Sequence, residues 1–330
     1  MTTTPIDRAD PSLETDGPAI ETDGLAKRYG STVALAGLTM TVPRGQVFGF
    51  LGPNGAGKTT AVKLLLGLAR PTGGSGRLLG APLGDRAVRR RVGYLPELFR
   101  YQAWLTADDV LEFHGRLAGL RTADRRASAI ESLRAVGLAD RADARVGTFS
   151  KGMQQRLGLA VALLGRPAVV ILDEPTSALD PLGRLDVRAI IRGLRDAGTA
   201  VFLNSHLLGE VERVCDVVAI VDRGRVVAAG PLDELLGEPT VRLRMTGLAG
   251  NALAGLASFG TLSEEPPWLV VRGCPQERIP DLVAAIVAVG GRIYAVDAGR
   301  ETLEERFVDL LGGRSSDAVD SADHRAHVGA

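Results

Sequence analysis

Cysteine is scarce in this sequence of 330 residues, which holds only two, Cys215 and Cys274. Two cysteines cannot build a disulfide framework, and they lack the paired spacing of zinc-binding motifs. The first residues are polar and acidic, without the positively charged start and the apolar stretch of a secretory signal. These absences exclude a small disulfide-rich secreted domain and indicate a cytosolic chain.

Long apolar runs and an excess of either charge are also missing. No stretch of about 18 apolar residues occurs, so we expect no helix to cross a membrane. The 39 basic residues balance 39 acidic ones, and this neutrality gives no bulk electrostatic reason to bind nucleic acid. The hydrophobic fraction of 45% is high enough for a real core, which excludes a chain that is disordered throughout.

Strand-like apolar runs alternate with helical patterns along much of the chain. Residues 47–51 and 169–172 are apolar almost throughout, as strands buried in a parallel sheet should be, so we predict an α/β domain around a mostly parallel sheet. Helical patterns without strands between them predict a helical subdomain at about 100–160. The predicted division of the chain is a disordered tail at 1–19, the α/β domain at 20–237, a small accessory α+β domain at 238–312 and a second disordered tail at 313–330.

A glycine-rich loop follows the first apolar run. Residues 52–59 fit the pattern G-x-x-x-x-G-K-[ST] between a predicted strand and a predicted helix, which is the context that this motif requires. The glycines let backbone N–H groups face a phosphate, and the start of the helix adds a favourable dipole. Lys58, one of only four lysines, would reach the β- and γ-phosphates, and the hydroxyl of Thr59 would bind Mg²⁺. The predicted phosphate-binding residues are Gly52, Pro53, Asn54, Gly55, Ala56, Gly57, Lys58, Thr59 and Thr60.

The second apolar run ends in two carboxylates, Asp173 and Glu174. The carboxyl end of such a strand faces the crevice of a doubly wound sheet, where ligands bind. Asp173 would hold the metal through a water molecule, and Glu174 is placed to polarise an attacking water. Many strands end in acidic turns, but a pair that follows a phosphate-binding loop indicates hydrolysis of a nucleotide.

A third motif lies between the loop and the acidic pair. Residues 149–156 read FSKGMQQR, with Ser150 at the start of a predicted helix. Helix capping by Ser150 is the plain interpretation of this segment. The segment also resembles the signature sequence of ATP-binding cassette (ABC) ATPases, which caps ATP bound on the opposite subunit.

The resemblance to ABC ATPases covers residues 20–237. It implies that residues 177–180 are the D-loop, that His206 is the switch histidine, and that Tyr29 stacks on adenine. A lone tyrosine or a histidine after a strand is more often structural, so these two roles depend on the resemblance. The nucleotide-binding residues that it implies besides the phosphate-binding loop are Tyr29, Ser150, Gly152, Gln154 and Asp180.

Three positions depart from the commonest pattern of the family. Glu97 stands in the Q-loop, where glutamine is usual, and its charge could change the affinity for a metal although it still offers an oxygen. In the signature, Lys151 stands where the family has glycine, and Met153 stands where glutamine is usual. These variants resemble those of type-2 ABC exporters, and residues 302–307 resemble the closing segment of the small accessory domain on such subunits.

The resemblance implies an ATPase that powers an exporter whose membrane-spanning permease is a separate chain. Two copies of this chain would form a homodimer at the cytoplasmic face of the membrane, with each ATP between residues 52–60 of one copy and 150–155 of the other. The implied cofactors are ATP and Mg²⁺. The implied catalytic residues are Glu174 and His206, and the implied metal ligands are Thr59, Asp173 and Glu97. A drug, an antibiotic or a lipid-like molecule is the expected cargo, and no nucleic-acid partner is expected.

Other roles of ABC ATPases fit the sequence less well. Proteins of DNA repair and chromosome maintenance carry long coiled coils between the phosphate-binding loop and the signature, and this interval is too short and lacks heptads. Translation-factor relatives carry two cassettes, whereas this chain has one. A soluble ABC protein with an assembly or regulatory role is an alternative that the accessory domain and the S-K-G-M variant disfavour. A pure binding or regulatory module is the remaining option, and the presence of Glu174 and His206 argues against it.

Overall fold

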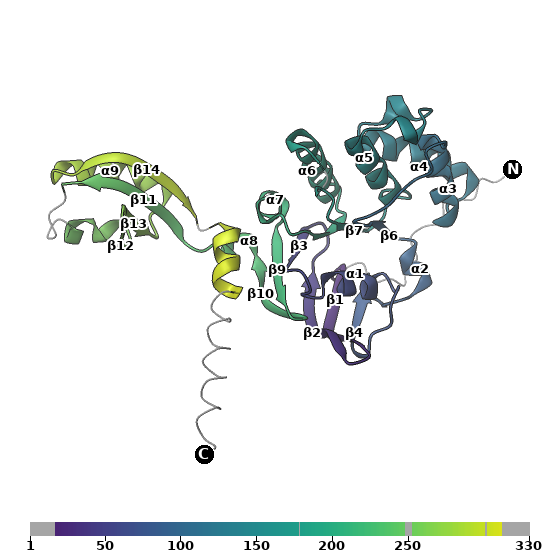
Figure 1. The fold of residues 1–330 in the computed structure, drawn as a ribbon, viewed down its shortest axis with the longest axis horizontal. Helices are drawn as coiled ribbons and strands as arrows, with labels where there is room; N and C mark the ends of the chain where they lie inside the picture. Colours follow the sequence, from purple (N-terminus) through teal and green to yellow (C-terminus); the bar gives the residue numbers. More distant parts are fainter. Residues whose placement is uncertain (1–16, 178, 248–252, 301, 312–330) are drawn as a thin grey trace, which may run out of the picture. The chain divides into compact units, whose positions relative to one another are not determined.

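The computed structural model describes residues 17–177, 179–247, 253–300 and 302–311 (Figure 1). The predicted tails lie outside the described residues, apart from 17–19. The chain divides after Pro231 into two units, each with its own hydrophobic core, whereas the sequence pattern places this division after residue 237. No helix in the described part of the chain is long and apolar enough to cross a membrane.

The centre of the first unit is a six-stranded sheet. Its strands, in order across the sheet, are β10 (Arg225–Pro231), β9 (Val217–Asp222), β3 (Val47–Leu51), β8 (Ala200–Asn204), β7 (Val169–Asp173) and β6 (Val92–Leu95). β10 is antiparallel to β9, and the other neighbours are parallel. Every residue of β3, β7 and β8 is buried, as expected for parallel strands covered on both faces. The predicted α/β fold around a mostly parallel sheet is confirmed.

A smaller antiparallel sheet and one helix cover the first face of the central sheet. The order of this second sheet is β2 (Thr32–Val42), β1 (Ile20–Tyr29), β4 (Gly73–Leu78) and β5 (Ala81–Pro82). Its buried side chains and those of α1 (Lys58–Leu65) pack around Phe48, Phe50 and Phe202 of the central sheet. The ring of Phe202 lies 5.8 Å from that of Phe48 and 5.2 Å from that of Phe50, measured between centroids. A short helix, α2 (Arg86–Arg89), follows this sheet.

Two helices pack on the other face, α6 (Pro181–Asp196) and α7 (Leu208–Val214). Asp180 is the N-cap of α6, and its carboxylate accepts a hydrogen bond from the Gly183 N–H at 2.8 Å. Proline occupies the first turn, and both the acidic cap and the proline are common at helix starts. Arg188 of α6 and Glu210 of α7 form a largely buried ion pair at 3.1 Å. This pair ties the helix that follows Glu174 to the helix that follows His206.

Between β6 and β7 the chain leaves the sheet for a helical insert. Its α-helices are α3 (Ala107–Leu117), α4 (Thr122–Ala135) and α5 (Lys151–Ala162), and two 3₁₀ turns, Ala139–Arg141 and Val146–Thr148, lie between α4 and α5. α3 begins with a capping box, in which the Thr106 hydroxyl accepts from the Asp109 N–H and the Asp109 carboxylate accepts from the Thr106 N–H. This device fixes the point at which the chain turns from loop into helix.

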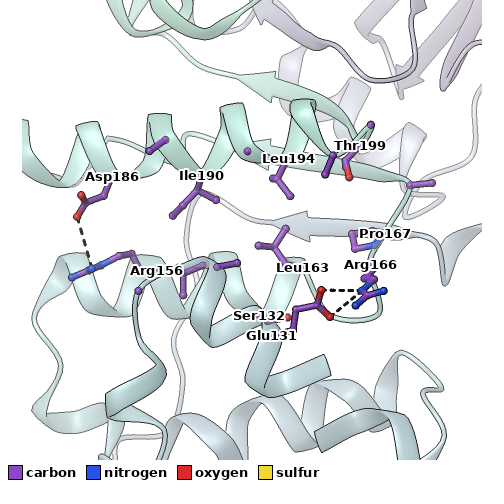
Figure 2. A pocket seen from close by; sticks show the side chains of 18 residues that line it. Glu131, Ser132, Arg156, Leu163, Arg166, Pro167, Asp186, Ile190, Leu194 and Thr199 are labelled. Carbon is purple, nitrogen blue, oxygen red and sulfur yellow. Dashed lines mark hydrogen bonds and ion pairs between the residues drawn. The ribbon is translucent and has the colours of Figure 1, made fainter. Parts of the chain in front are cut away.

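A groove of about 910 Å³ lies between the helical insert and α6 (Figure 2). Apolar side chains of α6 face those at the end of α5 across it, and ion pairs between Arg156 and Asp186 (3.8 Å) and between Glu131 and Arg166 (2.9 Å) lie at its edges. The groove adjoins the residues that precede β7 and β8. Ligands of doubly wound sheets bind at the opposite, carboxyl ends of the strands, so the chemistry must be sought away from this groove.

The second unit is the predicted small α+β domain. It begins with α8 (Leu232–Leu235) and holds an antiparallel sheet in the order β12 (Thr261–Glu265), β13 (Trp268–Arg272), β11 (Pro239–Thr246) and β14 (Arg292–Arg300). The 3₁₀ segments Leu253–Phe259 and Gln276–Arg278 precede β12 and α9 (Ile279–Ala288). α9 buries Leu282 and Ile286 in a core with Val241 and Leu243 of β11. Residues 303–311 form a last helix.

Candidate functional site

The glycine-rich loop occupies the turn between β3 and α1, at the carboxyl end of the central sheet. Gly55 and Gly57 have φ of +83° and +100°, which residues with a Cβ rarely adopt. A Cβ on Gly57 would lie 2.4 Å from the Ala34 carbonyl oxygen, and one on Gly52 would lie 2.3 Å from the Val221 carbonyl oxygen. The loop therefore needs glycine for its conformation at Gly55, for close contact with neighbouring backbone at Gly52, and for both reasons at Gly57.

Lys58 begins α1 and bends back over the loop. Its Nζ donates hydrogen bonds to the Gly52 oxygen at 2.6 Å and to the Pro53 oxygen at 3.1 Å. Burial lowers the pKa of Lys58, and the negative charges of Glu174, Asp173 and Glu97 act in the opposite direction. One cation thus lies within electrostatic reach of the three carboxylates that are predicted to bind the metal or to act in catalysis.

Asp173 ends β7 directly opposite Asn204, the last residue of β8. The Asn204 Nδ2 donates to Asp173 Oδ1 at 2.5 Å, and both side chains are almost fully buried. Burial raises the pKa of Asp173, and the negative charges of Glu97 and Glu174 raise it further. The hydrogen bond from Asn204 and the positive charge of Lys58 act in the opposite direction. A cation near Asp173 would stabilise its ionised form, since opposite charge favours a carboxylate.

Glu174, the next residue, is buried and has a left-handed backbone with φ of +52°. Its N–H donates to the Asn204 oxygen at 2.8 Å, which extends the link between β7 and β8. Its Oε1 lies 2.8 Å from His206 Nδ1, and its Oε2 accepts from the Ser205 hydroxyl at 3.4 Å. Backbone strain of this kind is concentrated at functional sites, and here the strained residue is the one whose carboxylate contacts the histidine.

Oxygen donors dominate this end of the sheet. Thr59 is exposed in the first turn of α1, Asp173 is buried, and Glu97 is exposed just after β6. In the part of the chain that the structure describes, no three His, Cys, Asp or Glu side chains are grouped so that they could hold a metal by themselves. That donor set fits Mg²⁺, which proteins commonly bind through one or two carboxylates together with substrate phosphates and water.

The signature residues form a separate group on the helical insert. Ser150 caps α5 by accepting from the Met153 N–H at 3.2 Å, so the capping role holds. Gln154 donates through Nε2 to the Phe149 oxygen at 3.3 Å. A hollow of about 400 Å³ is lined by residues 150–152 and 156 and by residues 179, 180, 182, 183 and 186, from the D-loop into α6. Of the predicted D-loop, Ala178 lies outside the described residues.

Tyr29 lies at the end of β1 with 48% of its surface exposed. The Lys27 Nζ lies 4.9 Å from the centroid of its ring. An exposed ring beside a cation has a free face for stacking, but among the described residues no hydrogen bond, ion pair or ring contact joins it to the other candidate residues. The structure thus brings Lys58, Asp173, Glu174 and His206 into one cluster and leaves the signature group and Tyr29 as two further surfaces.

Two polar residues of the cluster, Asn204 and Ser205, were given no role from the sequence. They lie at the end of an apolar strand, in the same position on β8 that Asp173 and Glu174 occupy on β7. Because the carboxyl ends of neighbouring parallel strands meet at one edge of the sheet, this shared position is the signal that could have found them. Gln155, the last residue of the signature range 150–155, is buried, and its Nε2 donates to the Pro175 oxygen at 2.9 Å, which connects α5 to the segment after Glu174.

Comparisons with known proteins agree with this arrangement. A family model described as ABC transporter matches residues 35–177. An uncharacterized ABC transporter ATP-binding protein of Nostoc sp. is 44% identical over 283 residues, which cover 84% of this chain and 83% of that protein. The daunorubicin/doxorubicin resistance ATP-binding protein DrrA of Streptomyces peucetius is 36% identical and covers 89% of this chain and 92% of its own length. A solved structure of the ATP binding subunit of an ABC transporter has a TM-score of 0.60 and 32% identity, covering 66% of this chain and 91% of that one. The chain therefore belongs to the ATP-binding proteins of ABC transporters, as the motifs predict.

Proposed function

We propose that this chain binds and hydrolyses ATP to power export through a membrane permease on a separate polypeptide. The observation that carries the proposal is the cluster at the carboxyl end of the central sheet, where buried Glu174 contacts His206 at 2.8 Å beside Asp173 and Lys58. The similarity to a drug-resistance ATP-binding protein, which extends over 92% of that protein, supports a cargo of the drug or antibiotic class.

In this proposal the phosphates of ATP lie against the backbone N–H groups of residues 52–57 and the ammonium of Lys58. Thr59, Asp173 and Glu97 would hold Mg²⁺, which supplies positive charge to the phosphate oxygens. Glu174 accepts a proton from the attacking water, and the imidazole of His206 keeps its carboxylate oriented toward that water.

The separate signature group supports a second part of the proposal, that two copies act together. Ser150 and Gly152 border a hollow shared with Asp180 of the same copy, and the residues that line it do not include the phosphate-binding loop. A head-to-tail homodimer would bring each signature group against the ATP of the other copy. ATP then acts as a ligand that binds the closed dimer better than the open one, and hydrolysis removes this preference.

The concentration dependence of hydrolysis tests this shared site. We expect the rate of phosphate release per molecule of the full chain to rise with protein concentration and to level off once the chain is dimeric. A rate per molecule that is constant down to concentrations at which sedimentation shows only monomers would contradict the shared site. Absence of any Mg²⁺-dependent hydrolysis would contradict the proposal as a whole.

The surface that follows Glu97 supports the docking of a permease. Leu98, Trp104 and Phe113 are large apolar side chains with 87%, 68% and 56% of their surfaces exposed. They lie on the segment that starts next to the ATP cluster and on α3 of the helical insert. Exposed apolar residues on a surface favour contact with a partner protein. Because these residues belong to the helical insert and to the segment that leads into it, a movement of the insert would be transmitted to a permease bound there.

The first mutational prediction concerns Tyr29. Replacing it by alanine should weaken ATP binding by about 1–3 kcal/mol, or roughly 5- to 150-fold in Kd, because stacking of a base on an aromatic ring is lost. Tyr29→Phe should keep the affinity, since the ring is retained. The measurement is equilibrium binding of ATP in the presence of EDTA, with Val33→Ala as a control for loss of an exposed apolar side chain nearby. Equal affinities of Tyr29→Ala and the wild type would remove Tyr29 from the site.

A further inference from the structure

Asn204 is one of the few polar side chains in the core of the first unit. It lies at the end of β8 with 2% of its surface exposed, directly opposite Asp173 in the parallel register. Burying an amide away from water is unfavourable unless its donors and acceptors find partners. An apolar side chain would extend the run of β8 at no such cost, so this asparagine requires an explanation.

Both backbone and side chain of Asn204 hold the acidic pair. The side-chain Nδ2 donates to Asp173 Oδ1 at 2.5 Å, and the backbone oxygen accepts from the Glu174 N–H at 2.8 Å. An ionised carboxylate can only accept hydrogen bonds, so the amide must turn its nitrogen toward Asp173. The orientation of the Asn204 amide is therefore dictated by Asp173.

This orientation leaves the other end of the amide without a partner. The Oδ1 of Asn204 is buried and accepts no hydrogen bond from any described residue. An unsatisfied buried acceptor lowers stability, and such atoms are rare in native proteins, where a functional role is one of the reasons for keeping them. Asn204 thus gives up one hydrogen bond in order to donate another to the Asp173 carboxylate.

We propose that Asn204 is a positioning residue, which holds the Asp173 carboxylate in the orientation that binds the divalent cation of the nucleotide. The proposal rests on the proposed ATP-dependent function and adds a residue to it. Partners that orient a metal ligand contribute to metal affinity without touching the metal, and their loss typically costs about 10- to 100-fold. The effect of Asn204 should therefore show in the requirement for Mg²⁺ and not in the affinity for the nucleotide alone.

The test is binding of a fluorescent, non-hydrolysable ATP analogue to the full chain over a series of Mg²⁺ concentrations. In Asn204→Leu, which has nearly the same shape without the donor, we expect the half-saturating Mg²⁺ concentration to rise about 10- to 100-fold. Binding of the analogue in EDTA should equal that of the wild type. Thr22→Val removes a comparable buried hydroxyl, which accepts from the Met40 N–H at 3.1 Å, and should leave the Mg²⁺ requirement unchanged.

A double-mutant cycle separates positioning from a general structural effect. In an Asp173→Asn background, Asn204→Leu should add no further increase in the Mg²⁺ requirement, because both changes act through one carboxylate. If Asn204→Leu does not fold, Asn204→Ser, which is too short to reach Asp173, is measured in its place with the same expectation.

Two results would overturn the proposal in distinguishable ways. An unchanged Mg²⁺ requirement in the Asn204 variant, beside a wild type that responds to Mg²⁺, would reject the positioning role alone. A wild-type chain whose binding of the analogue does not respond to Mg²⁺ would reject the proposed function and this role with it. Additive effects in the double-mutant cycle would show that Asn204 acts by another route, which also rejects the proposal.

Discussion

Replacing Glu174 by glutamine should lower the rate of ATP hydrolysis by at least about 100-fold while ATP binding is retained. Glutamine has the same shape and can still accept at Oε1 from His206 and keep its contact with Ser205, so the cluster should remain folded. It cannot accept a proton from the attacking water, and general-base catalysis typically contributes about 10²- to 10⁴-fold. The measurement is phosphate release by the purified full chain, paired with equilibrium binding of ATP.

The control for Glu174→Gln is Glu131→Gln, which makes the same chemical change in a carboxylate at the edge of the groove between the helical insert and α6. This variant should keep the wild-type rate. A Glu174→Gln variant that hydrolyses ATP within a few-fold of the wild-type rate would show that another group serves as the base. Loss of binding together with hydrolysis would assign Glu174 a structural role instead.

Replacing Lys58 by methionine should weaken ATP binding by about 1.5–3 kcal/mol, or roughly 10- to 150-fold in Kd, which is the range for a hydrogen bond to a charged group. The ammonium now donates to the Gly52 and Pro53 oxygens, and those contacts place it over the loop that would hold the phosphates. Because burial already lowers the pKa of Lys58, an uncharged side chain of similar length should not destabilise the fold. ATP binding and thermal unfolding of the variant are measured together.

Lys63 provides a matched control for Lys58, because it lies on the same helix with its side chain exposed. Lys63→Met should bind ATP as the wild type does. Equal affinities of Lys58→Met and Lys63→Met would mean that the position over the loop is not used for phosphate, and the proposed binding mode would have to be abandoned.

The central sheet could be predicted from the sequence because its strands are buried on both faces. Residues 47–51 and 169–172 are apolar almost without interruption, and the structure places both runs in one mostly parallel sheet, with β8 between them. The phosphate-binding loop and the acidic pair were also predictable, because each motif lies directly at the end of such a strand.

The side chains that meet at the site could not be predicted in the same way. The contact between Asn204 and Asp173 depends on which strands are neighbours and on their register, and a local pattern contains neither. The left-handed backbone of Glu174 accompanies the hydrogen bond that its N–H donates to the Asn204 oxygen of another strand, and nothing in its own residue type favours it. The groove beside α6 is likewise a product of tertiary packing between segments far apart in the chain (Figure 2).

The central claim is that ATP hydrolysis by this chain drives a separate membrane protein. Its most direct test compares the ATPase rate of the chain alone with the rate of the chain reconstituted with that protein in lipid vesicles. The account predicts that a polypeptide with several membrane spans copurifies with the tagged chain from detergent-solubilised membranes. The substitution Trp104→Ser should reduce the recovery of that polypeptide. A transported drug or antibiotic should raise the ATPase rate of the reconstituted pair. An active ATPase whose rate is the same with and without any membrane protein or candidate cargo would contradict the account and favour a soluble ABC ATPase with an assembly or regulatory role.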